Sequence, residues 1–336
     1  MWRFPTFVPK TKPLTPQISV LLPVYNEPLS WIACAIDSML HQIFQSMELI
    51  VIQDEPFRKD IEPLIRQYEQ QNYHIRFIIN SSNMGLAQTL NEGAGYARGK
   101  YIARMDADDI SFPHRLMRQF QFMEQNPDIG LSGCQVVKID ENESIVGHSN
   151  SPLECGLLYK MARFVNVVTH PTIIMRKTLF EKLSGYRNLP GGEDYDLLLR
   201  IIDLGVPIAN LPDFLLQYRV RSTGETVARS CTQKLCFKYV QRLYLERRQT
   251  GFDRFDASDI RAQIARAQIK YGRRQDKAQA GLVSARQARA AGNPVGASLH
   301  LISSFCVSPI QRAYYWDWFR AEAIRKWYGI RLSNPG

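Results

Sequence analysis

The chain has 336 residues, of which 45% are hydrophobic and 22% are charged. This composition supports one large or two ordinary folded domains and excludes a chain that is disordered throughout. The net charge of +10 is concentrated near one end, because residues 230–336 hold 19 lysines and arginines against 7 aspartates and glutamates. The sequence therefore predicts two regions, of which the basic one faces an anionic partner: a membrane surface, a phosphate-bearing acceptor or nucleic acid.

The first segment, residues 1–17, is rich in proline, lacks periodicity and is interpreted as an N-terminal strap. It has no sustained apolar run of the kind found in secretory signals. No stretch of the sequence approaches the ~18 apolar residues that a membrane-spanning helix needs. The six cysteines are scattered without close pairing, as is typical of reduced cysteines in a cytosolic protein. We therefore expect a cytoplasmic protein whose contact with a membrane is at most peripheral.

Apolar segments alternate with helical patterns over the next ninety residues or so. Buried strands are predicted at 18–25, 48–52, 75–79 and 101–105, and helices at 28–46, 60–71 and 85–98. Strands that alternate with helices at this spacing indicate βαβ units, an α/β fold and a mainly parallel sheet. Ligands of such sheets bind beyond the carboxyl ends of the strands. Polar residues fall there after each predicted strand, at 26–27, 53–54, 82–83 and 106–109.

The alternation weakens beyond residue 128. Shorter strands are predicted near 129–138 and 171–176, followed by a helix that carries residues 193–202. From about residue 230 the sequence is basic, rich in alanine and helical in pattern. Gly292-Asn293-Pro294 separates two helical stretches and predicts a helical hairpin.

Three carboxylates, Asp106, Asp108 and Asp109, follow the fourth predicted strand. Crowded carboxylates repel one another and are costly to desolvate, so a cation should compensate them. Mg²⁺ or Mn²⁺ takes oxygen ligands and keeps positions open for diphosphate oxygens. The alternative is an exposed acidic loop that caps the next helix through Asp109 or Ser111. The position after a strand of the predicted sheet favours the metal.

Glu193 and Asp194 open a predicted helix after two glycines. A carboxylate is electrostatically favoured at a helix N-terminus, and that is one interpretation of the pair. The other is a general base, in which Asp194 takes the proton from an attacking hydroxyl. On this pair alone, the first interpretation is the simpler one.

Other polar positions have two interpretations each. Asp54, after the second strand, suits either a nucleobase contact or a turn before a proline. Asn83 and Gly85 indicate a tight turn into a helix. Arg104 alternates into a buried strand and needs a partner, either a substrate phosphate or a neighbouring carboxylate. His170 precedes a proline and suits a core histidine better than an active-site group.

Taken together, these segments resemble glycosyltransferase family 2. The likeness keeps order and spacing from about residue 18 to 221 and runs through Ile18–Glu27 (ISVLLPVYNE), Leu49–Asp54 (LIVIQD), Asn83–Ala87 (NMGLA), Asn91, Ala97–Asp109 (ARGKYIARMDADD), Gly191–Leu197 (GGEDYDL) and Tyr218–Arg219. The nearest resemblance is to bacterial enzymes that build exopolysaccharide, O-antigen or lipopolysaccharide core.

The resemblance implies a GT-A fold and an inverting, metal-dependent transfer from a nucleoside diphosphate sugar, with a UDP-sugar expected. Asp106 and Asp108 would hold Mg²⁺ or Mn²⁺, and Asp194 would be the base with Glu193 beside it. The expected donor-binding residues are Pro23, Tyr25, Glu27, Asp54, Asn83, Gly85, Arg104, Asp106 and Arg221. His170 is expected on the acceptor side, where a saccharide or lipid-linked acceptor would bind.

Two departures from the family pattern stand out. Many members have two aspartates followed by Gly-Ser after the second strand, whereas this chain has Gln53-Asp54-Glu55-Pro56. Many members also have a histidine two residues after a Tyr-Arg pair, and this chain has Arg221 there. Arginine cannot ligate a cation but can bind phosphate, so we expect weaker metal dependence than is usual.

The predicted catalytic domain spans 18–228, with a donor half at about 18–110 and an acceptor half at about 111–228. The basic helical region, 229–336, lies beyond the family motifs. Its last part mixes aromatic and basic residues: Tyr314, Tyr315, Trp316, Trp318, Trp327 and Tyr328 with Arg312, Arg320, Arg325 and Lys326. Such a mixture suits a membrane interface with anionic lipids and equally suits packing of the aromatics onto the catalytic domain. No nucleic-acid-binding motif is present, so no nucleic-acid partner is expected.

Two other functions are compatible with a nucleotide-binding sheet of this kind. A sugar nucleotidyltransferase would need a glycine-rich phosphate loop after the first strand, and residues 23–27 contain no glycine. A non-catalytic binding module of the same fold would not need the acidic residues that are present here.

Overall fold

The computed structural model describes residues 15–72, 74–221, 225–290 and 292–329. The contacts among them divide the chain into two units. The second unit contains Tyr159–Val165, Asn188–Leu199 and the described residues after 223, and the first unit contains the rest. The helices α5 (Cys155–Ala162) and α7 (Glu193–Asp203) each contribute residues to both units.

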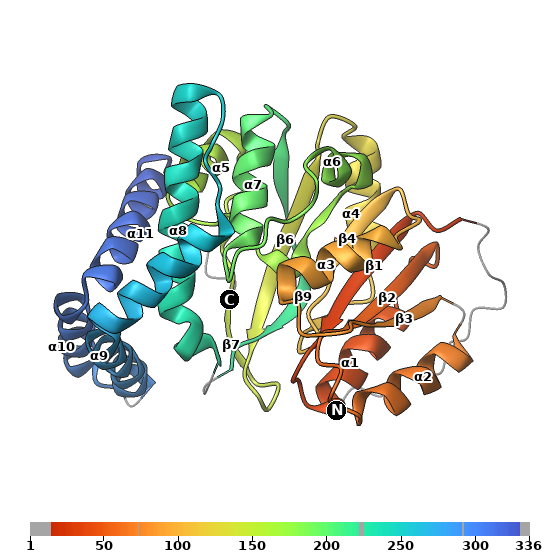
Figure 1. Cartoon of the computed structure of the whole chain (residues 1–336), viewed down its shortest axis with the longest axis horizontal. Helices are drawn as coiled ribbons and strands as arrows, with labels where there is room; N and C mark the ends of the chain where they lie inside the picture. The colour runs from red at the N-terminus through yellow and green to blue at the C-terminus, as the bar shows by residue number, and fades with distance from the viewer. Residues whose placement is uncertain (1–14, 73, 222–224, 291, 330–336) are drawn as a thin grey trace. The chain divides into compact units, whose positions relative to one another are not determined.

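The first unit is built on one mixed sheet, and its amino-terminal half is parallel. The four predicted strands are confirmed as β1 (Ile18–Val24), β2 (Met47–Gln53), β3 (Ile75–Ile79) and β4 (Tyr101–Arg104). They lie in the order β3-β2-β1-β4 with parallel pairing throughout. Figure 1 shows β1, β2 and β3 side by side in this part of the sheet.

The other half of the sheet is mostly antiparallel. It continues from β4 through β8 (Ile174–Arg176), β6 (Leu131–Ile139), β9 (Ile208–Arg219) and β5 (Ile110–Ser111). A further strand, β7 (Ile145–His148), pairs with β6. Among these pairs only β6 and β9 run parallel.

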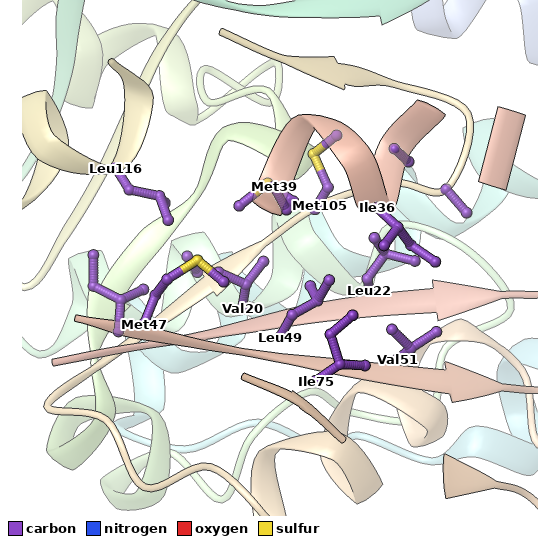
Figure 2. Packing of buried hydrophobic residues seen from close by; sticks show 14 of the residues in the cluster. Val20, Leu22, Ile36, Met39, Met47, Leu49, Val51, Ile75, Met105 and Leu116 are labelled. Carbon is purple, nitrogen blue, oxygen red and sulfur yellow. The ribbon is translucent and has the colours of Figure 1, made fainter. Parts of the chain in front are cut away.

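The helices of the first unit cover both faces of the parallel block. They are α1 (Leu29–Leu40), α2 (Ile61–Gln71), α3 (Leu86–Gly95), α4 (Arg115–Gln125) and α6 (Lys177–Lys182), with a single 3₁₀ turn, η1 (His170–Thr172). On one face, Leu22 of β1 points toward Ile36 of α1, as Figure 2 shows, and Val20 belongs to the same cluster of buried residues. On the other face, Leu21 lies against Gly93 of α3. The continuous apolar runs of β1 and β2 follow from this burial on both faces.

The long strand β9 was missed in the sequence, because Pro212 interrupts its apolar pattern. Opposite this proline the register shifts, since Cys134 of β6 pairs with Leu211 while the next residue, Gln135, pairs with Phe214. The two intervening residues form a bulge, which is where a sheet tolerates a proline that cannot donate a ladder hydrogen bond.

The order of the parallel strands creates a switch point between β1 and β4. The chain leaves β1 toward β2 on one side, whereas β4 lies on the other side. The loops that follow these two strands therefore diverge, and ligands of open α/β sheets bind in the crevice so formed. Tyr25 and Glu27 follow β1, and the three aspartates follow β4.

The second unit is helical. Its helices are α8 (Glu225–Thr250), α9 (Ala257–Ala290), α10 (Pro294–Val307) and α11 (Pro309–Trp327), so α8 begins four residues before the predicted start of the basic region at 229. The predicted hairpin is confirmed, because Ser304 Oγ of α10 donates a hydrogen bond to the carbonyl of Ala278 in α9 at 2.6 Å. Asn293 caps α10 by accepting the Gly296 N–H at 2.8 Å.

Candidate active site

The short strand β5 brings the acidic loop beside the end of β9. Ile110 pairs antiparallel with Gln217, so the residues just before β5 lie opposite those just after Gln217. The backbone N–H of Arg219 donates to Asp109 Oδ1 at 2.8 Å, and Arg219 Nε donates to the carbonyl of Asp108 at 2.8 Å. Residues more than 100 positions apart thus meet in one site.

A buried amide fixes β5 on its other side. Gln42, 2% exposed in the loop after α1, donates from Nε2 to Ser111 Oγ at 3.2 Å and to the carbonyl of Phe112 at 2.8 Å. Its Oε1 accepts the N–H of Leu116 at 3.0 Å. The peptide that follows the acidic loop is therefore held from the loop after α1 as well as from β9.

The acidic loop is a candidate metal centre. Asp106, Asp108 and Asp109 each offer a carboxylate oxygen, and these oxygens lie within 4.8 Å of one another. Asp109 is 1% exposed, whereas Asp106 and Asp108 are partly buried. Arg104 pairs with Asp106 at 2.6 Å, which is one of the two partners expected for this arginine, and its contact with a substrate phosphate stays a prediction.

The buried carboxylates of the site resist joint ionisation. Burial and the neighbouring Asp106 raise the pKa of Asp108 to about 6, against the lowering effect of Arg221. Burial and the charge of Asp108 raise the pKa of Asp109 well above its ordinary value. A group of hard oxygen donors that resist joint ionisation fits a divalent cation, which would favour the ionised forms.

Arg221 lies against this cluster. Its Nε and Nη2 both contact Asp108 Oδ2 at 2.9 Å, and Nη2 lies 3.6 Å from Glu27 Oε1. The guanidinium carbon stands 5.3 Å from the centre of the Trp31 ring, and that of Arg219 stands 4.7 Å from the same ring. The predicted donor residues Glu27 and Arg221 thus meet the predicted metal ligand Asp108.

The loop after β1 is held by its own hydrogen bonds. Glu27 Oε2 accepts the N–H of Tyr25 at 2.8 Å. Arg58 Nη1 donates to the carbonyl of Glu27 at 2.6 Å, and Arg58 also pairs with Asp60. Pro23 lies in β1 one residue before its end and is partly buried. These contacts fix the predicted nucleoside side of the site at the switch point.

Asp54 organises the turn that contains Asn83 and Gly85. Its Oδ1 accepts the N–H of Met84 at 2.9 Å and Nδ2 of Asn80 at 2.8 Å, while its Oδ2 accepts the N–H of Gly85 at 2.9 Å. Gly85 has a φ of +79°, a conformation that favours glycine. Asp54 is 5% exposed and shapes the amino-terminal end of α3, and its contact with a nucleobase stays a prediction.

Glu193 and Asp194 belong to the second unit. They open α7 as expected, after Gly191 and Gly192, which have positive φ values of 142° and 77°. Asp194 Oδ1 accepts the N–H of Tyr195 at 2.8 Å. A side chain at Gly192 would meet the ring of Phe237 at 2.9 Å, so this turn is closely packed against α8. The meeting of Asp194 with Asp106 and Asp108 stays a prediction.

His170 occupies the 3₁₀ turn before β8. Its Nε2 lies 3.1 Å from the Tyr186 hydroxyl, and the Tyr186 N–H donates to Asn91 Oδ1 at 2.9 Å. Burial, and after it the positive charge of Arg104, lower the pKa of His170 well below its ordinary value. The histidine is therefore neutral at pH 7, and its role toward an acceptor stays a prediction.

Three residues of this site were missed in the sequence. The sequence indicates Arg219 only as part of a motif, and it predicts no role for Trp31 or Arg58. Trp31 lies in the first turn of α1, close behind Glu27, and its polar neighbours are a signal that it is not purely a core residue. Arg58 stands in a polar loop, where no local pattern indicates its contact with Glu27.

The comparisons with known proteins agree with this architecture. Residues 19–184 match the family model described as glycosyl transferase family 2. A glycosyltransferase of uncharacterized function from Methanocaldococcus jannaschii is 34% identical over 225 residues, which is 67% of this chain and 78% of that protein. The amylovoran biosynthesis glycosyltransferase AmsE of Erwinia amylovora is 31% identical over 70% of this chain and 88% of its own length. The O-antigen biosynthesis glycosyltransferase WbnJ of Escherichia coli is 31% identical over 69% of this chain and 90% of its own length.

Solved structures show the same fold at low sequence identity. S. aureus TarS 1–349 in complex with UDP-GlcNAc superposes with a TM-score of 0.57 at 16% identity, over 85% of this chain and 91% of that one. The mannosyltransferase PcManGT from Pyrobaculum calidifontis, in complex with GDP-Man and Mn²⁺, superposes with a TM-score of 0.55 at 16% identity, over 98% of this chain and 92% of that one. The fold is therefore GT-A, with a helical carboxyl-terminal region. On its motifs and its relatives, the chain belongs to glycosyl transferase family 2 and is a glycosyltransferase.

Proposed function

We propose that this glycosyltransferase moves a sugar from a nucleoside diphosphate sugar, a UDP-sugar in the first instance, to a saccharide or lipid-linked acceptor in cell-surface polysaccharide biosynthesis. The observation that carries the proposal is the carboxylate cluster at the end of β4, beside the loop after β1 at the switch point of the sheet. The names of AmsE and WbnJ support the polysaccharide pathway. The ligands of the two solved structures support a nucleotide-sugar donor.

The chemistry proposed is a single displacement with inversion at the sugar carbon. Asp106 and Asp108 would hold Mg²⁺ or Mn²⁺, which when bound offsets the negative charge that develops on the departing diphosphate. Tyr25 and Glu27 bind the nucleoside side of the donor. Asp194, with Glu193 beside it, accepts the proton of the attacking acceptor hydroxyl.

The experiment begins with a screen of nucleotide sugars by thermal shift, with and without Mn²⁺, because a bound donor stabilises the folded state by mass action. With the donor found, Asp194→Asn is expected to abolish sugar transfer while donor affinity stays close to that of the wild type. Asp108→Ala is expected to remove the Mn²⁺-dependent part of donor binding. Glu181→Gln, an exposed carboxylate change in the first unit, is the control. Near-normal turnover of Asp194→Asn would show that the base is another residue.

We further propose peripheral attachment of the cytoplasmic protein to an anionic membrane through α10 and α11. No helix in the described part of the chain is long and apolar enough to span a bilayer. On α10, Val295, Leu299 and Ile302 lie at i, i+4 and i+7, and they are 70%, 63% and 59% exposed. No lysine, arginine, aspartate or glutamate occurs at 290–311. An exposed apolar stripe of this kind suits the headgroup boundary of a membrane.

Helix α11 adds aromatic and basic groups. Trp316, Phe319 and Trp327 are about half exposed or more, and Arg312 and Lys326 are exposed as well. Aromatic rings and cations together suit anionic headgroups. We expect Leu299→Asp in the full chain to reduce co-sedimentation with phosphatidylglycerol vesicles, while Phe57→Asp, at a more exposed apolar site in the first unit, leaves it unchanged. Equal binding of the two variants to the vesicles would contradict this attachment.

A further inference from the structure

The guanidinium of Arg221 occupies the side of Asp108 that faces Glu27. Two of its nitrogens converge on a single oxygen, Asp108 Oδ2, at 2.9 Å each. Glu27 Oε1 lies 3.6 Å from Nη2, and the ring of Trp31 lies beneath the guanidinium. The arginine and both carboxylates are more than four-fifths buried, so solvent screens their interaction only in part.

This arrangement sets the arginine against a divalent cation. A cation ligated by either oxygen of Asp108 stands next to a permanent positive charge, and the two repel each other. The arginine also neutralises part of the charge that would attract the cation. Arginine cannot lose its proton in a protein, so the repulsion cannot be relieved by titration.

A diphosphate removes this conflict. Its oxygens add negative charge between the two positive groups and offer the guanidinium new acceptors, for which its planar fork of donors is well suited. The carboxylate that Arg221 then releases becomes available to the cation.

We propose that Arg221 makes cation binding at Asp106 and Asp108 conditional on a diphosphate. Without diphosphate, Arg221 holds Asp108 and weakens the site for Mg²⁺ or Mn²⁺. With diphosphate, Arg221 binds the phosphate oxygens, and the cation and the nucleotide strengthen each other's binding by the same factor, as linkage requires. The inference rests on the proposed function in one respect, because it assumes that the diphosphate belongs to a nucleotide sugar.

The first test uses Mn²⁺ alone, titrated into the full chain and followed by the electron paramagnetic resonance signal of free Mn²⁺. We expect Arg221→Gln to bind Mn²⁺ about tenfold more tightly than the wild type, a factor typical of coupled sites. Arg221→Lys keeps the charge and should stay close to the wild type. Arg66→Gln, which removes an exposed arginine that also pairs with two carboxylates, is the matched control. Equal or weaker Mn²⁺ binding by Arg221→Gln, in a protein that melts like the wild type, would overturn the inference.

The second test measures the coupling between cation and nucleotide. UDP and GDP are titrated by calorimetry with and without Mn²⁺, and the ratio of the two affinities is compared among variants. We expect a large ratio in the wild type and a ratio about tenfold smaller in Arg221→Gln. A ratio unchanged by Arg221→Gln would refute the coupling. Failure of both nucleotides to bind the wild type would instead contradict the proposed donor class, whereas the comparison with Mn²⁺ alone decides the role of Arg221 independently.

Discussion

Asp54 is expected to be a major stabilising residue of the first unit, although it lies at the edge of the site. Its carboxylate accepts three hydrogen bonds, from Asn80 Nδ2 and from the N–H groups of Met84 and Gly85. Hydrogen bonds to a charged group contribute about 1.5–3 kcal/mol each. The three share one acceptor and are not additive, so we expect Asp54→Ala to lower the free energy of unfolding by about 3–5 kcal/mol.

The isosteric change Asp54→Asn separates charge from shape. The asparagine amide keeps one acceptor oxygen, but its NH₂ group is a donor and cannot accept a hydrogen bond from a backbone N–H. We therefore expect Asp54→Asn to lower the free energy of unfolding by about 2 kcal/mol. The assay is urea unfolding followed by circular dichroism, with the slope checked for two-state behaviour. Asn83→Ala is the matched control, because the exposed Asn83 Oδ1 contacts the same Gly85 N–H at 3.2 Å. Its effect should stay within about 0.5 kcal/mol. A loss below about 1 kcal/mol for Asp54→Ala would refute the reasoning, since three bonds to a buried carboxylate cannot cost so little.

Two further predictions concern single positions. A side chain at Gly99 would meet the backbone nitrogen of Ser19 at 2.6 Å, whereas one at Gly95 would meet nothing within 4 Å. In urea titrations we expect Gly99→Ala to lower the free energy of unfolding by about 1–3 kcal/mol and Gly95→Ala to leave it unchanged or raise it slightly. Equal effects of the two substitutions would contradict the close packing of β1 on residue 99. The lowered pKa of His170 means that the unfolded chain binds a proton there more readily than the folded chain, so stability is lost as pH falls below the ordinary value of 6.5. We expect His170→Phe to flatten the decline between pH 6.5 and pH 5 by up to about 1.4 kcal/mol per pH unit, measured by unfolding at each pH, and an unchanged slope would show that the group titrates normally when folded.

Local pattern was sufficient to predict the parallel half of the sheet. The strands around Val20 and Val51 are almost continuously apolar because helices cover both faces, and such runs can be recognised in the sequence without knowledge of the partner strands. Strand β9 was missed because Pro212 and Asp213 interrupt its pattern, and the bulge that accommodates them exists only opposite β6. The periodicity of one segment cannot reveal a bulge, because a bulge depends on the pairing of two strands.

The residues of the site were easier to predict than their contacts. The clustering of Asp106, Asp108 and Asp109 could be predicted because several carboxylates follow one buried strand within four residues, and their role as metal ligands stays a prediction. The partnership of Asp108 with Arg221 was not, since it depends on the pairing of Ile110 with Gln217 across more than 100 residues. Arg221 was expected to contact phosphate, and its hold on Asp108 emerged only from the tertiary structure.

The position of the acidic loop depends on the buried amide of Gln42. This uncharged side chain is hidden from any ligand, yet it fixes the peptide that directly follows the aspartates through Ser111 and Phe112. A displacement of that peptide by a fraction of an ångström would alter the spacing of the carboxylate oxygens that we propose as ligands of one ion. Substitution of Gln42 is therefore expected to change the geometry of the acidic loop, although the side chain is buried. A search for improved variants that covers only exposed residues would overlook this position.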